Sequence, residues 1–294
     1  MSASQKIEDG KHLGSRYMEA TEVKPKAGRR GGGPANPGDG VLPILRQLEP
    51  GRLKVVGTGF YITRYGLVAT AKHVIEDFAE GTQLLTAYIP HLAPDNKVHL
   101  RQLLKASLLK SADVAVAQAD NFLRSYPMQP LANLRSVLSH VTPSNGERLA
   151  TFAYPENAIL DFSKGEPPEI RGDYYTGKFV RAVSTRENPY MALPYWESTV
   201  EVRGGASGAP VFDSSGRVVA VNCRGWDFRG AEHEGNILSY QVPVTHLLDL
   251  EIDPFLVPPE SWEAQQIPTP HRNRLLTVRD LVDFGHIAWE PSLI

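Results

Sequence analysis

The chain has 294 residues, of which 41% are hydrophobic and 22% charged, and its formal net charge is −2. This length is enough to bury one large hydrophobic core or two smaller ones. The near-neutral charge gives no electrostatic reason to expect nucleic acid or a membrane as a partner, and no apolar run approaches the roughly 20 residues of a membrane helix.

Residues 1–40 are predicted to be a flexible N-terminal extension. They are polar and end in glycine- and proline-rich clusters, so they bury too little apolar surface to offset the entropy of ordering. A short helix is expected at Lys11–Val23. The arginine–glycine cluster Gly28–Pro34 could contact RNA, but one short copy is weak evidence, and we expect no nucleic-acid partner.

The start of the chain and its cysteine content predict its compartment. Residues 1–10 lack the apolar core of a signal peptide, and Cys223 is the single cysteine, so no intramolecular disulfide can form. Both features are typical of a reducing, cytoplasmic location.

From residue 41 onward, short apolar runs are separated by turn residues, which predicts an all-β barrel or sandwich. Helical turns are expected at Val74–Phe78, at His246–Leu250 and at Thr277–Asp283, where Thr277 is placed to cap the helix. The tail 256–294 either packs on the preceding strands or docks onto another protein. The predicted strands are Leu53–Ile62, Leu67–Ala71, Leu84–Ile89, Val98–Leu104, Val114–Ala117, Leu149–Tyr154, Tyr174–Val183, Thr199–Val202, Pro210–Phe212, Val218–Cys223 and Leu238–Val244.

The segment Gly204–Pro210 places the hydroxyl of Ser207 in a glycine-rich bend. A serine needs a base and a charge-stabilising pocket to act as a nucleophile. Flanking glycines let main-chain N–H groups turn toward a developing oxyanion. The segment therefore predicts a serine hydrolase.

A candidate base and acid lie upstream of this serine. His73 follows the run Leu67–Ala71, where an imidazole can take the serine proton and later return it. The alternative is a histidine that merely opens a short helix. Asp113 stands among small residues at the start of an apolar strand, where a carboxylate would orient the imidazole. The competing acids are Asp77, Asp95 and Asp120.

Taken in order, Thr-Ala-Lys-His-Val, Asp-Val-Ala-Val and Gly-Ala-Ser-Gly-Ala-Pro resemble the chymotrypsin-like (trypsin-fold) serine proteases, and most of all their disulfide-free bacterial branch. The resemblance covers roughly residues 41–252. The order His, Asp, Ser differs from the Ser, Asp, His order of the α/β-hydrolases, and no Gly-x-Ser-x-Gly elbow is present. Ala206 stands where digestive members carry an aspartate that pairs with a new amino terminus, so that activation switch is absent.

The resemblance implies two antiparallel Greek-key β-barrels, over about 41–125 and about 141–252, with short helices and a C-terminal extension at 253–294. His73 and Asp113 would come from the first barrel and Ser207 from the second. The main-chain N–H groups of Gly205 and Ser207 would form the oxyanion hole.

The same resemblance implies a peptide-binding strand at Val219–Gly225, which includes Cys223 and Gly225. Cys223 is either a small buried apolar residue or a redox group, and the first is favoured. Glu201 falls at the floor of the specificity pocket and Ser239 at its wall. An acid at the floor would select Lys or Arg. The alternative, which we favour, is that Glu201 faces water or pairs with Arg203 or Arg224.

These features predict a serine endopeptidase that hydrolyses proteins or peptides through an acyl-enzyme. The alternative is a catalytically latent, protease-like scaffold that binds peptides or partner proteins, and a weaker one is an esterase. No motif for a metal or a nucleotide cofactor is present, so we expect neither. The terminal extensions are candidate sites for a regulatory protein partner.

Overall fold

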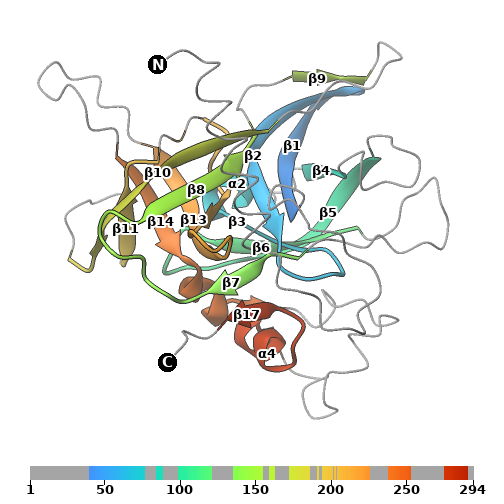
Figure 1. Cartoon of the computed structure of the whole chain (residues 1–294). Coiled ribbons are helices and arrows are strands. Elements are labelled where there is room, and N and C mark those ends of the chain that lie inside the picture. The colour runs from blue at the N-terminus through green and yellow to red at the C-terminus, as the bar shows by residue number, and fades with distance from the viewer. Residues whose placement is uncertain are drawn as a thin grey trace, which may run out of the picture.

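The computed structural model describes residues 40–76, 84–88, 99–120, 135–154, 159–162, 172–185, 191, 194–200, 202, 204–225, 238–252 and 275–290, and the fold concerns these ranges (Figure 1). The predicted helix at Lys11–Val23 and the predicted pocket residue Glu201 lie outside them. The described residues contain no helix that is long and apolar enough to cross a membrane.

The first barrel is a closed ring of antiparallel strands in the order β1-β4-β5-β6-β3-β2, because β1 also pairs with β2. Its interior is almost continuously apolar, and strands buried on both sides carry such runs rather than a strict alternation. A short strand, β9, pairs with the first three residues of β2. The strands are β1 (Val41–Glu49), β2 (Arg52–Tyr61), β3 (Leu67–Thr70), β4 (Leu84–Tyr88), β5 (His99–Leu108), β6 (Ala115–Ala119) and β9 (Ile159–Asp161).

The second barrel follows the order β12-β8-β10-β11-β14-β13, and pairing of β12 with β13 joins its two ends. Two further strands add to its outside in parallel: β7 pairs with β13, and β17 pairs with β7. The strands are β7 (Val137–Ser139), β8 (Arg148–Ala153), β10 (Asp173–Val183), β11 (Tyr195–Ser198), β12 (Pro210–Phe212), β13 (Val218–Gly225), β14 (Ser239–Pro243) and β17 (Ala288–Glu290). The all-β prediction of two antiparallel barrels with short helices is confirmed.

The predicted strand Thr199–Val202 is wrong, and the strand of this region is β11, which ends at Ser198. At Thr199 only half of the ladder to β10 remains: the Thr199 N–H donates to the Lys178 carbonyl at 2.9 Å, but the Lys178 N–H donates to the side-chain Oγ1 of Thr199, also at 2.9 Å. The chain then crosses directly over Gly177, where an added Cβ would stand 2.3 Å from the Val200 nitrogen. This crossing leads the chain out of the sheet toward the loop that carries Ser207.

The helices are short. α2 (Lys72–Ile75) follows β3, and the 3-10 helix η5 (Val244–Asp249) follows β14. α4 (Val278–Asp283) begins after Thr277 as predicted, since Thr277 and Asp280 form a reciprocal capping box.

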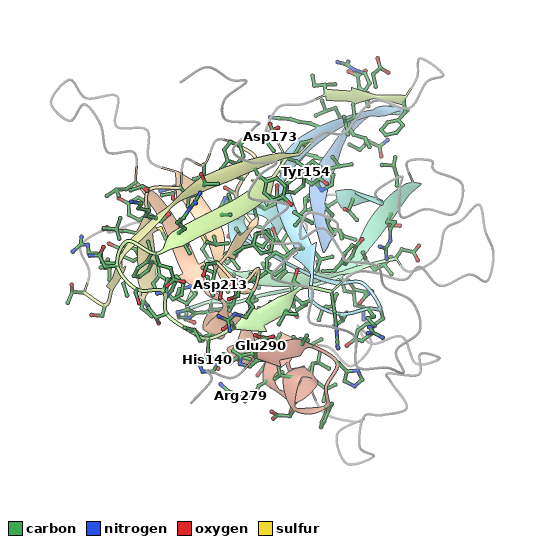
Figure 2. All side chains as sticks on the ribbon, viewed as in Figure 1. His140, Tyr154, Asp173, Asp213, Arg279 and Glu290 are labelled. Atoms are coloured by element: carbon green, nitrogen blue, oxygen red, sulfur yellow. The ribbon has the colours of Figure 1, made fainter. Side chains whose placement is uncertain are left out.

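The described part of the C-terminal extension packs on both barrels. Strand β16 (Leu276–Thr277) pairs with β15 (Glu251–Ile252) behind the second barrel. Figure 2 shows Asp213 and Glu290 close together beside β17, and Arg217 bridges them at 2.8 and 3.2 Å. The ring of His286 lies 6.0 Å from that of Tyr65 in the first barrel. Residues 275–290 are thus part of the folded unit.

Candidate active site

His73 and Asp113 are joined by two hydrogen bonds. The strand β3 ends at Thr70, and Ala71 is still extended, so α2 begins at the edge of the first barrel and carries His73 on its first turn. The His73 N–H, one of the helix-start donors that lack an intrahelical partner, donates to Asp113 Oδ1 at 3.0 Å. The ring Nδ1 lies 2.7 Å from Asp113 Oδ2.

This arrangement sets the tautomer of the imidazole. A carboxylate only accepts hydrogen bonds, so Nδ1 carries a proton, and the neutral form of the imidazole has its lone pair on Nε2. Asp113 grips both the main chain and the ring of His73, which fixes the direction in which Nε2 points. The His73 side chain is 44% exposed, so its outer face is open to a reactant.

Ser207 lies in the loop between β11 and β12, and Cys223 of β13 connects it to Asp113. The Ser207 hydroxyl donates to the Cys223 carbonyl at 3.2 Å. The Cys223 thiol in turn donates to the Asp113 carbonyl at 3.3 Å. Within the described residues no hydrogen bond joins Ser207 to His73.

Close packing also holds the Ser207 loop against the start of α2. The place where a Cβ on Gly57 would stand is 2.5 Å from Val74 Cγ1 and 3.1 Å from the Ser207 carbonyl oxygen. A Cβ on Gly208 would stand 2.1 Å from the Thr58 carbonyl oxygen and 2.9 Å from the Ala71 nitrogen. Glycine at these positions therefore lets the second barrel bring Ser207 next to the turn that carries His73.

Thr58 fixes the loop that would stabilise an oxyanion. Gly205 has a φ of 92°, a conformation that favours glycine. Its carbonyl accepts from Thr58 Oγ1 at 2.7 Å, and the Ser207 carbonyl accepts from the Thr58 N–H at 2.9 Å. Both carbonyls are held by the first barrel. Among the described residues, the N–H groups of Gly205 and Ser207 take part in no hydrogen bond.

Cys223 is a free, buried cysteine. Burial, and then the negative charge of Asp113, raise the pKa of its thiol well above its usual value. The thiol is therefore protonated at neutral pH, where it serves as a hydrogen-bond donor to Asp113.

The remaining predicted residues lie around β13 and β14. Ser239 is paired with Gly225 across these strands, and the Ser239 hydroxyl lies 2.9 Å from the Ser198 hydroxyl. The competing acids Asp77 and Asp95 lie outside the described residues. Asp120 directly follows β6, and its carbonyl accepts a hydrogen bond from Arg101 Nε.

Sequence reasoning missed Thr58. It stands between two glycines in a predicted strand, where nothing in the sequence marks its contact with a loop about 150 residues away. In the part of the chain that the structure describes, no cluster of three or more His, Cys, Asp or Glu side chains could hold a metal ion.

The comparisons with known proteins agree with this fold. The profile of the trypsin-like peptidase domain matches residues 57–221, more than half of the chain. The chain belongs to the trypsin-like peptidase family. The matched residues of this peptidase domain include His73, Asp113 and Ser207, and the predicted resemblance to the chymotrypsin-like serine proteases is confirmed.

Solved structures similar to this peptidase domain include Deg5, at 16% sequence identity and a TM-score of 0.48, covering 70% of this chain and 84% of that chain. An inactive mutant form of Rv3671c from M. tuberculosis is 17% identical with a TM-score of 0.45, covering 71% of this chain and 82% of that chain. A search of curated proteins gives no significant match.

Proposed function

We propose that this chain is a serine endopeptidase in which Ser207 is the nucleophile, His73 the general acid and base, and Asp113 the orienting carboxylate. The single observation that carries the proposal is the paired contact of His73 with Asp113, at 3.0 Å to the main chain and 2.7 Å to the ring. A histidine that merely opened a short helix would not need both contacts.

In the proposed reaction, the Ser207 hydroxyl rotates from the Cys223 carbonyl toward His73 Nε2. Nε2 takes the proton while Oγ bonds to the peptide carbonyl carbon. The N–H groups of Gly205 and Ser207 donate to the oxyanion of the tetrahedral intermediate. His73 then gives its proton to the leaving amine as the C–N bond breaks, and a water molecule repeats the sequence to release the acid and restore Ser207.

The second candidate function, a catalytically latent scaffold that binds peptides, is favoured by a different observation. The Ser207 hydroxyl is bonded to Cys223. In the free protein this contact turns the hydroxyl away from the role of a nucleophile, as the scaffold requires; the endopeptidase requires in addition that the hydroxyl rotate when a peptide binds, since catalytic hydrogen bonds often tighten only in a complex.

A fluorophosphonate probe separates the candidate functions. The endopeptidase predicts a covalent adduct on Ser207 that is absent from Ser207→Ala and strongly reduced in His73→Ala, together with cleavage of peptides. Folded protein that is never labelled would support the scaffold. Labelling and ester turnover without cleavage of any peptide in a library would support an esterase.

A further inference from the structure

Five polar side chains cross the interior of the second barrel, and none is exposed by more than 1%. We call them the polar row: Thr151 of β8, Ser198 of β11, Asn222 of β13, and Ser239 and Gln241 of β14. The rest of this barrel core is made of apolar side chains such as Trp196 and Val211. Moving a polar side chain from water into an apolar core costs free energy unless its hydrogen bonds are replaced, so five of them together are unusual in such a core.

The members of the polar row bond mainly to one another. Gln241 Nε2 donates to the hydroxyls of Ser198 and Ser239 at 2.6 and 2.7 Å. Asn222 Nδ2 donates to Thr151 Oγ1 at 2.8 Å. Side chain to side chain bonds are the minority in proteins, about one in eight of all hydrogen bonds.

The polar row is attached to the loop that carries Ser207. The Gly208 N–H donates to the Asn222 carbonyl at 2.6 Å, and the Asn222 N–H donates to the Ala209 carbonyl at 2.9 Å. Thr151 Oγ1 donates to the Pro210 carbonyl at 2.7 Å. The polar row therefore lies directly beneath the residues that follow Ser207.

Two acceptors of the polar row are unsatisfied. Among the described residues, Asn222 Oδ1 and Gln241 Oε1 are buried without a hydrogen-bond partner. Asn222 and Gln241 are directly opposite each other on β13 and β14, so their side chains leave the same face of the sheet side by side. Each unmet acceptor costs about 1–3 kcal/mol, and folded proteins leave few of them.

A buried glutamine of the first barrel, Gln118, shows what a purely structural role looks like. Its Oε1 is also unmet, but its Nε2 donates to the main-chain carbonyls of Tyr65 and Ala119 at 2.8 and 2.6 Å. Within the described part of the chain, Gln118 makes hydrogen bonds to these two carbonyls and none to the Ser207 loop. Among the described residues, Gln241 bonds to side chains rather than to main-chain groups, and its Oε1 is the part of the carboxamide that remains unpaired.

We infer that the polar row is the specificity subsite of the proposed endopeptidase and that it takes an uncharged carboxamide side chain, that of glutamine or asparagine, from the residue before the scissile bond. This inference rests on the proposed function, since that function puts the scissile bond at Ser207. The amide NH₂ of the substrate donates to Asn222 Oδ1 and Gln241 Oε1. The hydroxyls of Ser198 and Ser239 donate to its carbonyl oxygen.

Charge decides between a carboxamide and a cation. No member of the polar row is ionisable at neutral pH, so a lysine ammonium would find no counter-charge among these five side chains, and burying it unpaired is far more costly than burying an amide. An apolar side chain would leave both acceptors unmet. Val202 lies across the end of β13, with its carbonyl oxygen 2.7 Å from where a Cβ on Gly225 would stand, so the occupant displaces Val202 on entry.

Binding to the Ser207→Ala protein tests the subsite without any need for catalysis. Fluorescence anisotropy is measured with three labelled peptides that differ only in the residue before the would-be scissile bond, which is Gln, Met or Lys. Met has nearly the shape of Gln without its hydrogen bonds. We expect the Gln peptide to bind at least about tenfold more tightly than the other two, because a site built to hydrogen-bond rejects an analogue that cannot.

A pair of glutamine variants assigns the preference to the polar row. In the Ser207→Ala background, Gln241→Met should weaken binding of the Gln peptide at least about tenfold and leave the Met peptide unchanged. The matched control Gln118→Met should keep the preference. Thermal unfolding of each variant shows whether it is folded. If Gln241→Met does not fold, the comparison of the three peptides on the Ser207→Ala protein still tests the inference.

Equal binding of the three peptides, no binding of any, tighter binding of Met, or tightest binding of Lys would each overturn the inference. The Lys result would instead favour the predicted acid at Glu201. If the protein prefers the Gln peptide but no probe labels Ser207, the subsite is supported and the proposed endopeptidase activity is contradicted. If a probe labels Ser207 but the protein shows no preference for the Gln peptide, the endopeptidase is supported and the subsite is contradicted.

Discussion

The uncharged buried polar side chains of the two barrels are bonded in different ways, although the first barrel also has a side-chain bond from the buried Arg101 to the Tyr61 hydroxyl. In the first barrel, threonine and glutamine side chains bond to main-chain groups, as Thr70 Oγ1 does to the Thr58 carbonyl and Thr86 Oγ1 to the Pro43 carbonyl. In the second barrel, Ser198, Ser239 and Gln241 bond to one another. Main-chain bonds fix strands, whereas a side-chain network with spare acceptors is suited to a ligand.

The difference matches the division of labour that we propose. The first barrel supplies the general base His73, which is on the short helix α2, and Asp113, which stands just before β6 and orients His73. The second barrel supplies the nucleophile loop and, beneath it, the polar row. Four substitutions test the roles that we assign to the two barrels.

The largest expected effect is that of Asp113→Asn in the first barrel. An asparagine can donate to Nδ1 and so favour the wrong tautomer of His73, and we expect the rate of Ser207 labelling to fall by about 10⁴. Stopped-time labelling followed by mass spectrometry measures this rate. Asp120→Asn, at the other end of β6, is the control and should leave the rate unchanged; a fall of the same size in Asp120→Asn would transfer the role to Asp120.

Next in size is Gly208→Ala at the contact between the barrels. The new Cβ would stand 2.1 Å from Thr70 Oγ1, so the two atoms would overlap, and the φ of 85° would strain the main chain of an alanine. We expect the free energy of unfolding to fall by at least about 3 kcal/mol, measured by urea denaturation. Gly146→Ala has a similar φ with nothing within 4 Å and should lose only about 1–2 kcal/mol. Equal losses would mean that the barrels do not meet closely at Gly208.

Thr58→Val has a smaller effect, of about 2 kcal/mol, because it leaves the Gly205 carbonyl and the Tyr154 N–H unpaired. It should also slow labelling of Ser207 about tenfold, since Gly205 is no longer held. The matched control Thr86→Val lies within the first barrel and should lose stability without slowing the reaction. Identical rates in the two variants would show that Thr58 does not position the loop.

The smallest effect is a pH dependence from Cys223. The unfolded thiol releases its proton near its ordinary pKa of 9.0, but the folded thiol, whose pKa is raised, keeps its proton. Stability is therefore fully present below pH 9.0 and falls as pH rises toward the folded pKa, by up to about 1.4 kcal/mol per pH unit. Cys223→Ala should remove this part of the alkaline loss in denaturation curves at pH 8 to 10.5. An unchanged slope would contradict a buried, protonated thiol.

Local patterns were enough to predict the all-β class, most strands and the candidate residues His73, Asp113 and Ser207, because each of these stands out in its own short motif. The strand β1 was missed since Pro43 is atypical of a strand interior, yet it pairs with Thr58 in a closed barrel. The end of β11 at Ser198 depends on the contact of Thr199 with Lys178, which no local pattern contains.

The role of Thr58 and the polar row could not be predicted for the same reason. They are defined by contacts between residues far apart in the chain, such as Thr58 with Gly205 and Asn222 with Thr151. A polar residue in an apolar strand signals only that a partner exists somewhere.

The most direct test of the central claim is a crystal structure of the protein after reaction with a peptidyl phosphonate. We predict phosphorus bonded to Ser207 Oγ, with one phosphonate oxygen about 3 Å from the N–H groups of Gly205 and Ser207 and with His73 Nε2 within hydrogen-bond reach of Oγ. An adduct in which His73 Nε2 lies out of hydrogen-bond reach of Ser207 Oγ, or unmodified Ser207 in every molecule, would contradict it.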